Sequence, residues 1–162
     1  MPDLSRQLHG VLLTDRTRPL DETSDLVWAS LEDVGAYRSW WPWLRRFEAD
    51  ALVAGACWLA RIRIPMPWEL RLELRLDRVE APRRVEATVT GDVAGTAAVT
   101  VEAHGDASVI RLESALVPRH RLLRAVNRVL PSVSRRLHDR VVDSAFEQFA
   151  DRPRPDGVGW GR

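Results

Sequence analysis

The sequence contains no lysine. Its 24 basic residues are all arginine and stand against 23 acidic residues, a net charge of +1 over 162 residues. Without a lysine amine the chain has no Schiff-base nucleophile, no lysine general base and no phosphate-loop lysine. The near balance of the two signs gives no overall field that would attract nucleic acid. We therefore expect no nucleic-acid partner.

Cysteine and paired histidines are equally scarce. Cys57 is the one cysteine, so the chain forms no internal disulfide and no cysteine-based metal cluster. Its place beside Trp58 in an apparent strand predicts a buried, inert thiol. The histidines show no metal-ligand spacing, and we expect neither a metal nor an organic cofactor. They are His9, His104 and His120, the last two expected in solvent, and His138 at the border of an apolar helical stripe.

No apolar run approaches the length of a membrane span, and the first residues do not form a signal peptide. These absences predict a soluble, cytoplasmic protein, monomeric or homodimeric. The length predicts a single domain over residues 1–150, with a disordered tail rich in proline and glycine over residues 151–162. A basic amphipathic stretch at residues 119–128 is compatible with weak contact with a membrane surface, although an ordinary surface helix is the favoured interpretation.

The periodicity of apolar residues predicts an α+β fold. Residues 9–17 form a first strand, with Val11 and Leu13 on one face. Capping residues at 21–24 then begin a helix that ends at Gly35, and residues 37–45 form a second short helix kinked at Pro42. After residue 118 helical periodicity returns at residues 122–130 and 133–150.

Between residues 47 and 117 the period is two, as expected for strands. Residues 69–77 alternate strictly between charged and apolar side chains, and residues 58–64 are predicted to pair with them as a hairpin. Arg61 and Arg63 would then form a cross-strand ladder with Glu69 and Glu73. Turn residues delimit three further strands. The predicted order of elements is therefore a strand, two short helices, a six-stranded antiparallel meander and a long C-terminal helix. The three strands are residues 84–90, 96–103 and 108–117.

A tryptophan cluster is the most informative local feature. Trp40, Trp41 and Trp43 fall within four residues, and each indole buries a large area and carries one N–H that needs a partner. The cluster predicts either the rim of an apolar cavity or a densely packed corner. Several inward positions in the later strands are small, which favours a cavity. Trp68, in a rigid Pro-Met-Pro-Trp turn, either covers the mouth of the cavity or packs within its hairpin.

Three segments resemble one superfamily. Residues 26–34, running into Tyr37 and the Trp-Trp-Pro sequence, resemble the region between the first two helices of SRPBCC (START-like) proteins, which include polyketide cyclases/dehydrases and lipid-transport-type proteins. Residues 91–96 resemble their mid-sheet hairpin. His138 on a helix after Pro131 is similar to bacterial members. The resemblance covers residues 9–150 and implies the helix-grip fold, a curved antiparallel sheet wrapped around a long C-terminal helix.

The resemblance also implies the binding, and possible transport, of a hydrophobic small molecule such as a lipid or polyketide between sheet and helix. A cofactor-independent cyclase or aromatase is the alternative, with Tyr37, Ser114, Asn127, His138 and either Arg71 or Arg75 as candidates; the sequence leans against an enzyme. A third hypothesis is an interaction module whose interior is filled by its own tryptophans and phenylalanines. The residues expected to line a ligand site are Tyr37, Trp40, Trp41, Trp43, Trp58, Ile62, Met66, Trp68, Leu72, Leu74, Val89, Val99, Ser114, Leu116, His138, Val141 and Ala145.

Overall fold

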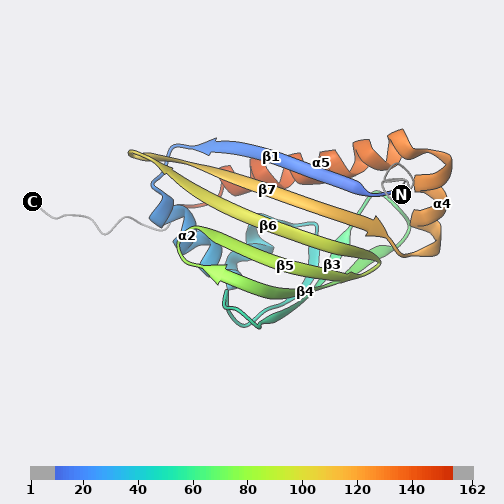
Figure 1. The fold of residues 1–162 in the computed structure, drawn as a ribbon, viewed down its shortest axis with the longest axis horizontal. Coiled ribbons are helices and arrows are strands. Elements are labelled where there is room, and N and C mark those ends of the chain that lie inside the picture. Colours follow the sequence, from blue (N-terminus) through green and yellow to red (C-terminus); the bar gives the residue numbers. More distant parts are fainter. Residues whose placement is uncertain (1–9, 155–162) are drawn as a thin grey trace, which may run out of the picture.

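Seven antiparallel strands form one curved sheet that closes against a long helix (Figure 1). The computed structural model describes residues 10–154. The strands are β1 (Leu12–Leu20), β2 (Leu44–Glu48), β3 (Cys57–Arg63), β4 (Glu69–Glu80), β5 (Arg84–Gly91), β6 (Val93–His104) and β7 (Ala107–Pro118). The helices are α2 (Ser24–Glu32), the 3-10 turn η1 (Val34–Ala36), α3 (Tyr37–Trp40), α4 (Arg121–Val129) and α5 (Pro131–Ala150).

The strand order is β1-β7-β6-β5-β4-β3-β2, so β2 to β7 form the predicted six-stranded meander and β1 returns to pair with β7. In Figure 1 α5 runs along the sheet beside β1, while α2 and α4 stand at opposite ends of the molecule. The predicted α+β helix-grip fold is confirmed. The C-terminal helical region divides at Leu130 and Pro131 into α4 and α5, close to the predicted division.

Alternation along the strands separates a dry face from a wet face, as predicted. In β4 the leucines point toward α5 and the intervening arginines and acids are exposed. Two glycines of the β5–β6 region permit close strand approach. A Cβ at Gly91 would lie 2.3 Å from the carbonyl oxygen of Arg71, and one at Gly95 would lie 1.9 Å from that of Ala115. Both have positive φ, so larger residues there would be strained as well as crowded.

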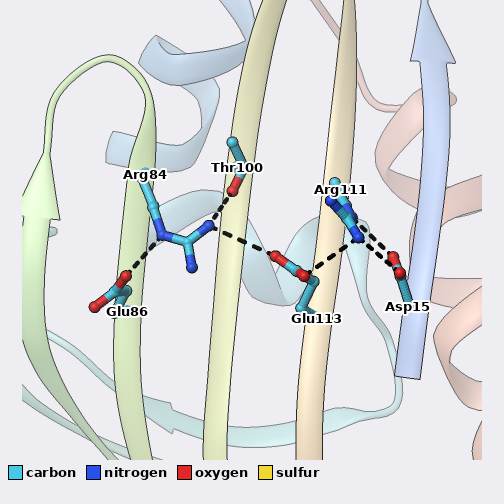
Figure 2. A network of polar contacts seen from close by, with 6 residues as sticks. All are labelled: Asp15, Arg84, Glu86, Thr100, Arg111 and Glu113. Carbon is cyan, nitrogen blue, oxygen red and sulfur yellow. Dashed lines mark hydrogen bonds and ion pairs between the residues drawn. The ribbon is translucent and has the colours of Figure 1, made fainter. Parts of the chain in front are cut away.

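The outer face of the sheet carries a charged network across four strands (Figure 2). Arg84 Nε donates to Glu86 at 2.7 Å, and its Nη1 lies 3.6 Å from Glu113. Arg111 binds Asp15 through two hydrogen bonds of 2.8 and 2.7 Å and lies 3.3 Å from Glu113. The hydrogen bond from Arg111 holds the pKa of Asp15 below its ordinary value. These charges satisfy one another, and the network joins β5 to β1 across the sheet.

The predicted ladder between β3 and β4 is only partly correct. The two strands do pair, with Arg63 opposite Glu69, but Arg61 lies opposite Arg71 and Leu59 lies opposite Glu73. The four charged residues share the outer face, but Arg61 lies opposite an arginine and only diagonal to Glu69 and Glu73. Ion pairs instead run along a strand, as between Arg75 and Asp77 at 3.0 Å.

Three local predictions differ from the structure. The second helix ends at Trp40, and the chain after Pro42 enters β2 at Leu44, because proline interrupts helical hydrogen bonding. In β1 the inward face holds Leu12 and the buried Thr14, whereas Leu13 is exposed. Cys57 is exposed rather than buried, since it begins β3 on the outer face.

A buried ion pair fastens the end of α5 to the segment between β1 and α2. Arg152 Nη1 lies 3.0 Å from Glu22 Oε1, and the two side chains are 0% and 3% exposed. The guanidinium also donates to the carbonyl of Phe149 at 2.7 Å and lies 3.8 Å from the centre of its ring. The tail predicted from residue 151 thus begins with a residue packed in the interior, and residues 155–162 lie outside the described residues.

Candidate functional site: an apolar cavity under helix α5

An apolar cavity of about 180 Å³ lies between the sheet and the first half of α5. Its walls come from β1, β3, β4, β6 and β7 on one side and from α4 and α5 on the other, and it is partly open to solvent. Apolar side chains make up nearly all of the lining, and the polar side chains among them are Ser134 and His138. The lining residues are Leu12, Ile62, Ile64, Leu70, Leu72, Val93, Leu116, Pro118, Leu123, Ser134, Leu137, His138, Val141 and Val142.

The helical part of the wall follows from the spacing of residues on α5. Ser134, Leu137, His138 and Val141 are separated by three, four and seven positions, which places them on one face of an α-helix. Leu123 of α4 completes this wall. On the sheet side, alternate residues of β3 and β4 point inward, as the two-residue period requires.

The other half of the space between sheet and helix is filled by aromatic rings. Tyr37 lies at the centre, with its ring 5.0 Å from Trp41, 5.4 Å from Phe47 and 6.0 Å from Trp58. Trp41 also stacks on Phe149 of α5 at 6.2 Å. Edge-to-face and offset contacts at these distances are favourable for aromatic pairs. This half of the groove is therefore solid core.

Three indole N–H groups in this aromatic half, those of Trp41, Trp43 and Trp58, are satisfied within the protein. Trp41 donates to the carbonyl of Ala145 at 3.0 Å, and Trp43 donates to the side chain of Gln148 at 2.8 Å. Trp58 donates to the carbonyl of Ala51 at 3.0 Å. These bonds tie the segment after α3 to α5 and leave none of the three donors free for a ligand.

The structure divides the sequence-predicted site residues into two groups. Those on the cavity wall are Ile62, Leu72, Leu116, His138 and Val141. The others lie elsewhere, in the aromatic cluster, along the packed strands, in the β3–β4 turn or at the C-terminal half of α5. These are Tyr37, Trp40, Trp41, Trp43, Trp58, Met66, Trp68, Leu74, Val89, Val99, Ser114 and Ala145.

Nine wall residues were missed by the sequence analysis, and a usable signal existed for only some of them. Leu137 belongs to the predicted apolar stripe of α5, and Leu70 belongs to the strict alternation of β4. For the first strand the sequence analysis placed Val11 and Leu13 on one face and did not consider Leu12. Ser134 lies four positions before His138, so helical spacing was a usable signal for it, whereas Leu123 lines the cavity because α4 packs beside α5, which periodicity does not reveal.

The size of the cavity limits what it holds. Small-molecule pockets usually measure about 300–1,000 Å³, whereas an enclosed apolar cavity of about 150 Å³ is enough for benzene. At about 180 Å³ the space matches a single aromatic ring or a short branched chain. A long lipid or a polyketide chain would exceed it unless the aromatic cluster moved.

His138 is the wall residue with the strongest polar constraint. Its Nε2 shares a hydrogen bond of 2.5 Å with the hydroxyl of Thr14, a buried residue of β1. This bond fixes the orientation of the imidazole ring across the gap between helix and sheet. Burial lowers the pKa of His138 below the ordinary 6.5, and Arg16 acts in the same direction, while Asp139 opposes the shift. The imidazole is thus neutral near neutral pH.

The lowered pKa of His138 predicts a pH dependence of stability. Below pH 6.5 the unfolded chain takes up a proton on this histidine more readily than the folded protein does. The free energy of unfolding therefore decreases as the pH is lowered through that range. We expect the melting temperature to fall less between pH 7.5 and 5.5 in His138→Gln than in the unmodified protein. Thermal unfolding at both values measures this. The exposed His104→Gln should keep the unmodified slope, and equal slopes for His138→Gln and the unmodified protein would contradict the assignment.

Trp68 and His120 meet at the end of the molecule next to the cavity. Their rings stack at 5.4 Å with an angle of 22°, so His120 is not the solvated residue expected from the sequence. The indole Nε1 and the imidazole Nδ1 are both buried without a hydrogen-bond partner in the described structure. Ile64 and Leu70, which flank the turn of Trp68, line the cavity, whereas Trp68 itself packs beside it.

The residues considered for catalysis are dispersed. The Tyr37 hydroxyl donates to the carbonyl of Leu31 at 2.6 Å, and burial raises its pKa well above the usual range. Asn127 donates to the carbonyl of Gly10 at 3.1 Å. Arg71 and Arg75 are exposed on the outer face, as the alternation predicted. Only His138 of this set lies on the cavity wall, and residues 10–154 contain no cluster of potential metal ligands.

Comparison with known proteins identifies the fold. No protein-family model and no curated protein sequence matches this chain. The START superfamily protein from Mycobacterium smegmatis matches with a TM-score of 0.68 at 10% identity, covering 85% of this chain and 94% of that chain. A protein from Thermus thermophilus gives 0.70 at 13% identity, covering 86% and 94%. The Zhui aromatase/cyclase from a Streptomyces species gives 0.65 at 16% identity, covering 87% and 90%.

The sheet, the enclosing helix and the cavity between them define a helix-grip protein. The chain has the fold of the START-like (SRPBCC) superfamily, in agreement with the resemblance noted in the sequence. No helix within residues 10–154 is long and apolar enough to cross a membrane.

Proposed function

We propose that this protein binds a small apolar molecule in the cavity between its sheet and α5. The observation that carries the proposal is an unfilled space of about 180 Å³ lined almost entirely by apolar side chains. Moving apolar ligand surface from water into such a space is favourable by about 25 cal/mol per Å². A single aromatic ring or a short branched chain fits the volume.

Two polar side chains support a defined orientation for the ligand. Ser134 and His138 lie one helical turn apart on α5 and both reach the cavity. The hydrogen bond to Thr14 holds the imidazole in place, so its position is set before a ligand arrives. A ligand with one hydroxyl or carbonyl group at the edge of an apolar body would pair with these groups, as in most small-molecule sites.

A thermal-shift screen tests the proposal. Benzene, phenol, indole and short branched carboxylic acids are the probes, at concentrations of about 1 mM, which is about ten times a Kd of about 0.1 mM. A ligand at about ten times its Kd stabilises the folded state by about 1.4 kcal/mol, which raises the melting temperature by about 3–5 °C for a chain of this size. We expect at least one single-ring compound to produce such a shift.

Variants on α5 make the test specific. Val141→Trp places an indole in the cavity and should abolish the shift, and Val141→Phe is a milder variant in case overpacking prevents folding. Val133→Trp adds the same bulk to the same helix at a position that is 47% exposed, and it should leave the shift intact. Shifts that persist in Val141→Trp, or no shift from any probe, would contradict binding in this cavity.

A further inference from the structure

The region around α4 concentrates positive charge at one end of the molecule. Residues 119–136, called here the basic corner, contain six arginines and no acidic residue. The rest of the chain therefore holds 24 − 6 = 18 arginines against 23 acidic residues, a net charge of −5. In Figure 1 α4 stands at the end of the molecule opposite α2, so this charge is concentrated at one end of the molecule.

The arginines of the basic corner have no carboxylate partners in the described part of the chain, a property that they share with Arg18, Arg61, Arg63 and Arg71 of the sheet. Within residues 10–154 none of the six forms an ion pair. By contrast, Arg84 and Arg111 on the outer sheet face are each held by two carboxylates (Figure 2). In the basic corner six arginines occur in one segment with no acidic residue among them, which leaves their positive charge for an external anion.

Large apolar side chains are exposed beside these arginines. Leu122 is 52% exposed, Val129 73%, Leu130 51% and Val133 47%. The helix packs on the body through a different side, where Leu123 reaches the cavity. The apolar arc of α4 is thus wider than the part that is buried, and its exposed edge lies next to the basic face.

A groove of about 470 Å³ runs between α4 and the end of β7. Arg124 and Arg128, one helical turn apart, line it together with Val117 and Pro118. Guanidinium groups bind phosphate oxygens through paired N–H donors. Two of them above an apolar floor match a phosphate attached to a hydrocarbon body.

We propose that the basic corner docks on the surface of an anionic phospholipid bilayer. The arginines contact headgroup phosphates, and Leu122, Val129 and Leu130 enter the boundary with the acyl chains. A helix with a basic face and an exposed apolar edge lies in the plane of such an interface. Nucleic acid would account for the arginines but not for the apolar residues. The proposal stands apart from ligand binding, because it uses the outer side of α4, whereas the cavity uses the inner side.

Vesicle flotation with the full chain tests the docking surface. The probes are vesicles of pure phosphatidylcholine and vesicles with about 30% phosphatidylglycerol, each at about 0.1 and 0.5 M salt. We expect binding to the anionic vesicles at low salt, weakened at high salt by screening, and little binding to phosphatidylcholine. Arg121→Gln/Arg124→Gln/Arg128→Gln should weaken binding on the order of a hundredfold, from three surface charges. Leu122→Ser/Val129→Ser should also weaken it strongly.

A charge-matched control separates the docking surface from net charge. Arg61→Gln/Arg71→Gln/Arg83→Gln removes three exposed arginines from the sheet side and should leave vesicle binding nearly unchanged. The proposal is overturned if the unmodified protein does not float with anionic vesicles, or if the control triple loses as much binding as the α4 triple. It is also overturned if Leu122→Ser/Val129→Ser binds vesicles normally but converts a dimer to a monomer, because the surface then joins two copies of the chain.

Discussion

Replacing Arg152 by alanine is expected to lower the free energy of unfolding by about 3–5 kcal/mol. The change leaves the carboxylate of Glu22, whose side chain is 3% exposed, buried without its partner at 3.0 Å. It also removes the guanidinium that packs 3.8 Å from the centre of the Phe149 ring and donates to the carbonyl of that residue. Urea unfolding at neutral pH measures the loss.

Two comparisons show whether burial is the cause. Arg75→Ala breaks an exposed pair with Asp77 at the same distance of 3.0 Å and should cost at most about 1 kcal/mol. Glu22→Leu/Arg152→Met replaces both charges and should recover much of the loss, since no charge is then left unpaired. A cost for Arg152→Ala no larger than that for Arg75→Ala would show that the end of α5 is not anchored by this pair.

The second large effect is expected from Trp58→Ala, which should destabilise the protein by about 3–5 kcal/mol. Trp58 is 6% exposed, packs 5.5 Å from Phe47 and 6.0 Å from Tyr37, and donates to the carbonyl of Ala51. Truncation therefore removes a large buried area and leaves a void inside the aromatic cluster. Urea unfolding gives the magnitude, and Trp58→Leu serves if the alanine variant does not fold.

The Trp58→Leu variant also tests whether Trp58 belongs to the core alone or to the ligand site as well. Because Trp58 does not line the cavity, Trp58→Leu should keep the affinity of the protein for a ligand found in the thermal-shift screen. Trp68→Ala, which removes a half-buried ring stacked on His120, is the matched tryptophan variant and should cost less than Trp58→Ala, because less of its area is buried. Loss of ligand affinity in Trp58→Leu, at a temperature where the protein is folded, would show that Trp58 contributes to the binding site.

The strand and helix pattern is the part of the structure that the sequence predicted well. Residues 69–77 alternate so strictly that only a half-buried strand satisfies them, and β4 places them as expected. The division of the C-terminal helices follows from Pro131, which begins α5 at a position where its missing N–H costs nothing. The sequence did not identify the inward face of the first strand, because leucine occurs on both faces, at Leu12 and Leu13, and Leu13 is the exposed one.

The position of the cavity was not predictable from periodicity. The tryptophan cluster was compatible with a rim or with a packed corner, and the choice depends on whether each indole finds a partner from a distant segment. Trp41 and Trp43 find theirs on α5, more than a hundred residues later in the chain. The small strand residues that indicated space do not line the cavity, which lies between the sheet and the first half of α5.

The structure agrees with one part of the hypothesis of an interaction module with a filled interior and disagrees with another. Tryptophan and phenylalanine rings do fill one half of the groove, and an apolar patch is exposed on α4. The other half nevertheless remains open beside His138. Because aromatic rings fill half of the space between the sheet and α5, the proposed ligand is a small molecule. This distinguishes the proposed function from the carriage of a long lipid.

The most direct measurement of the central claim is a crystal of this protein under xenon pressure, or soaked with bromobenzene. Both probes enter dry apolar cavities, and their anomalous scattering gives a position. The account predicts one strong peak bounded by Leu72, Leu116 and Val141, absent in Val141→Trp. A crystal without a peak there, with Leu137 and Val142 closed onto the sheet, would show that the interior is solid and would contradict ligand binding.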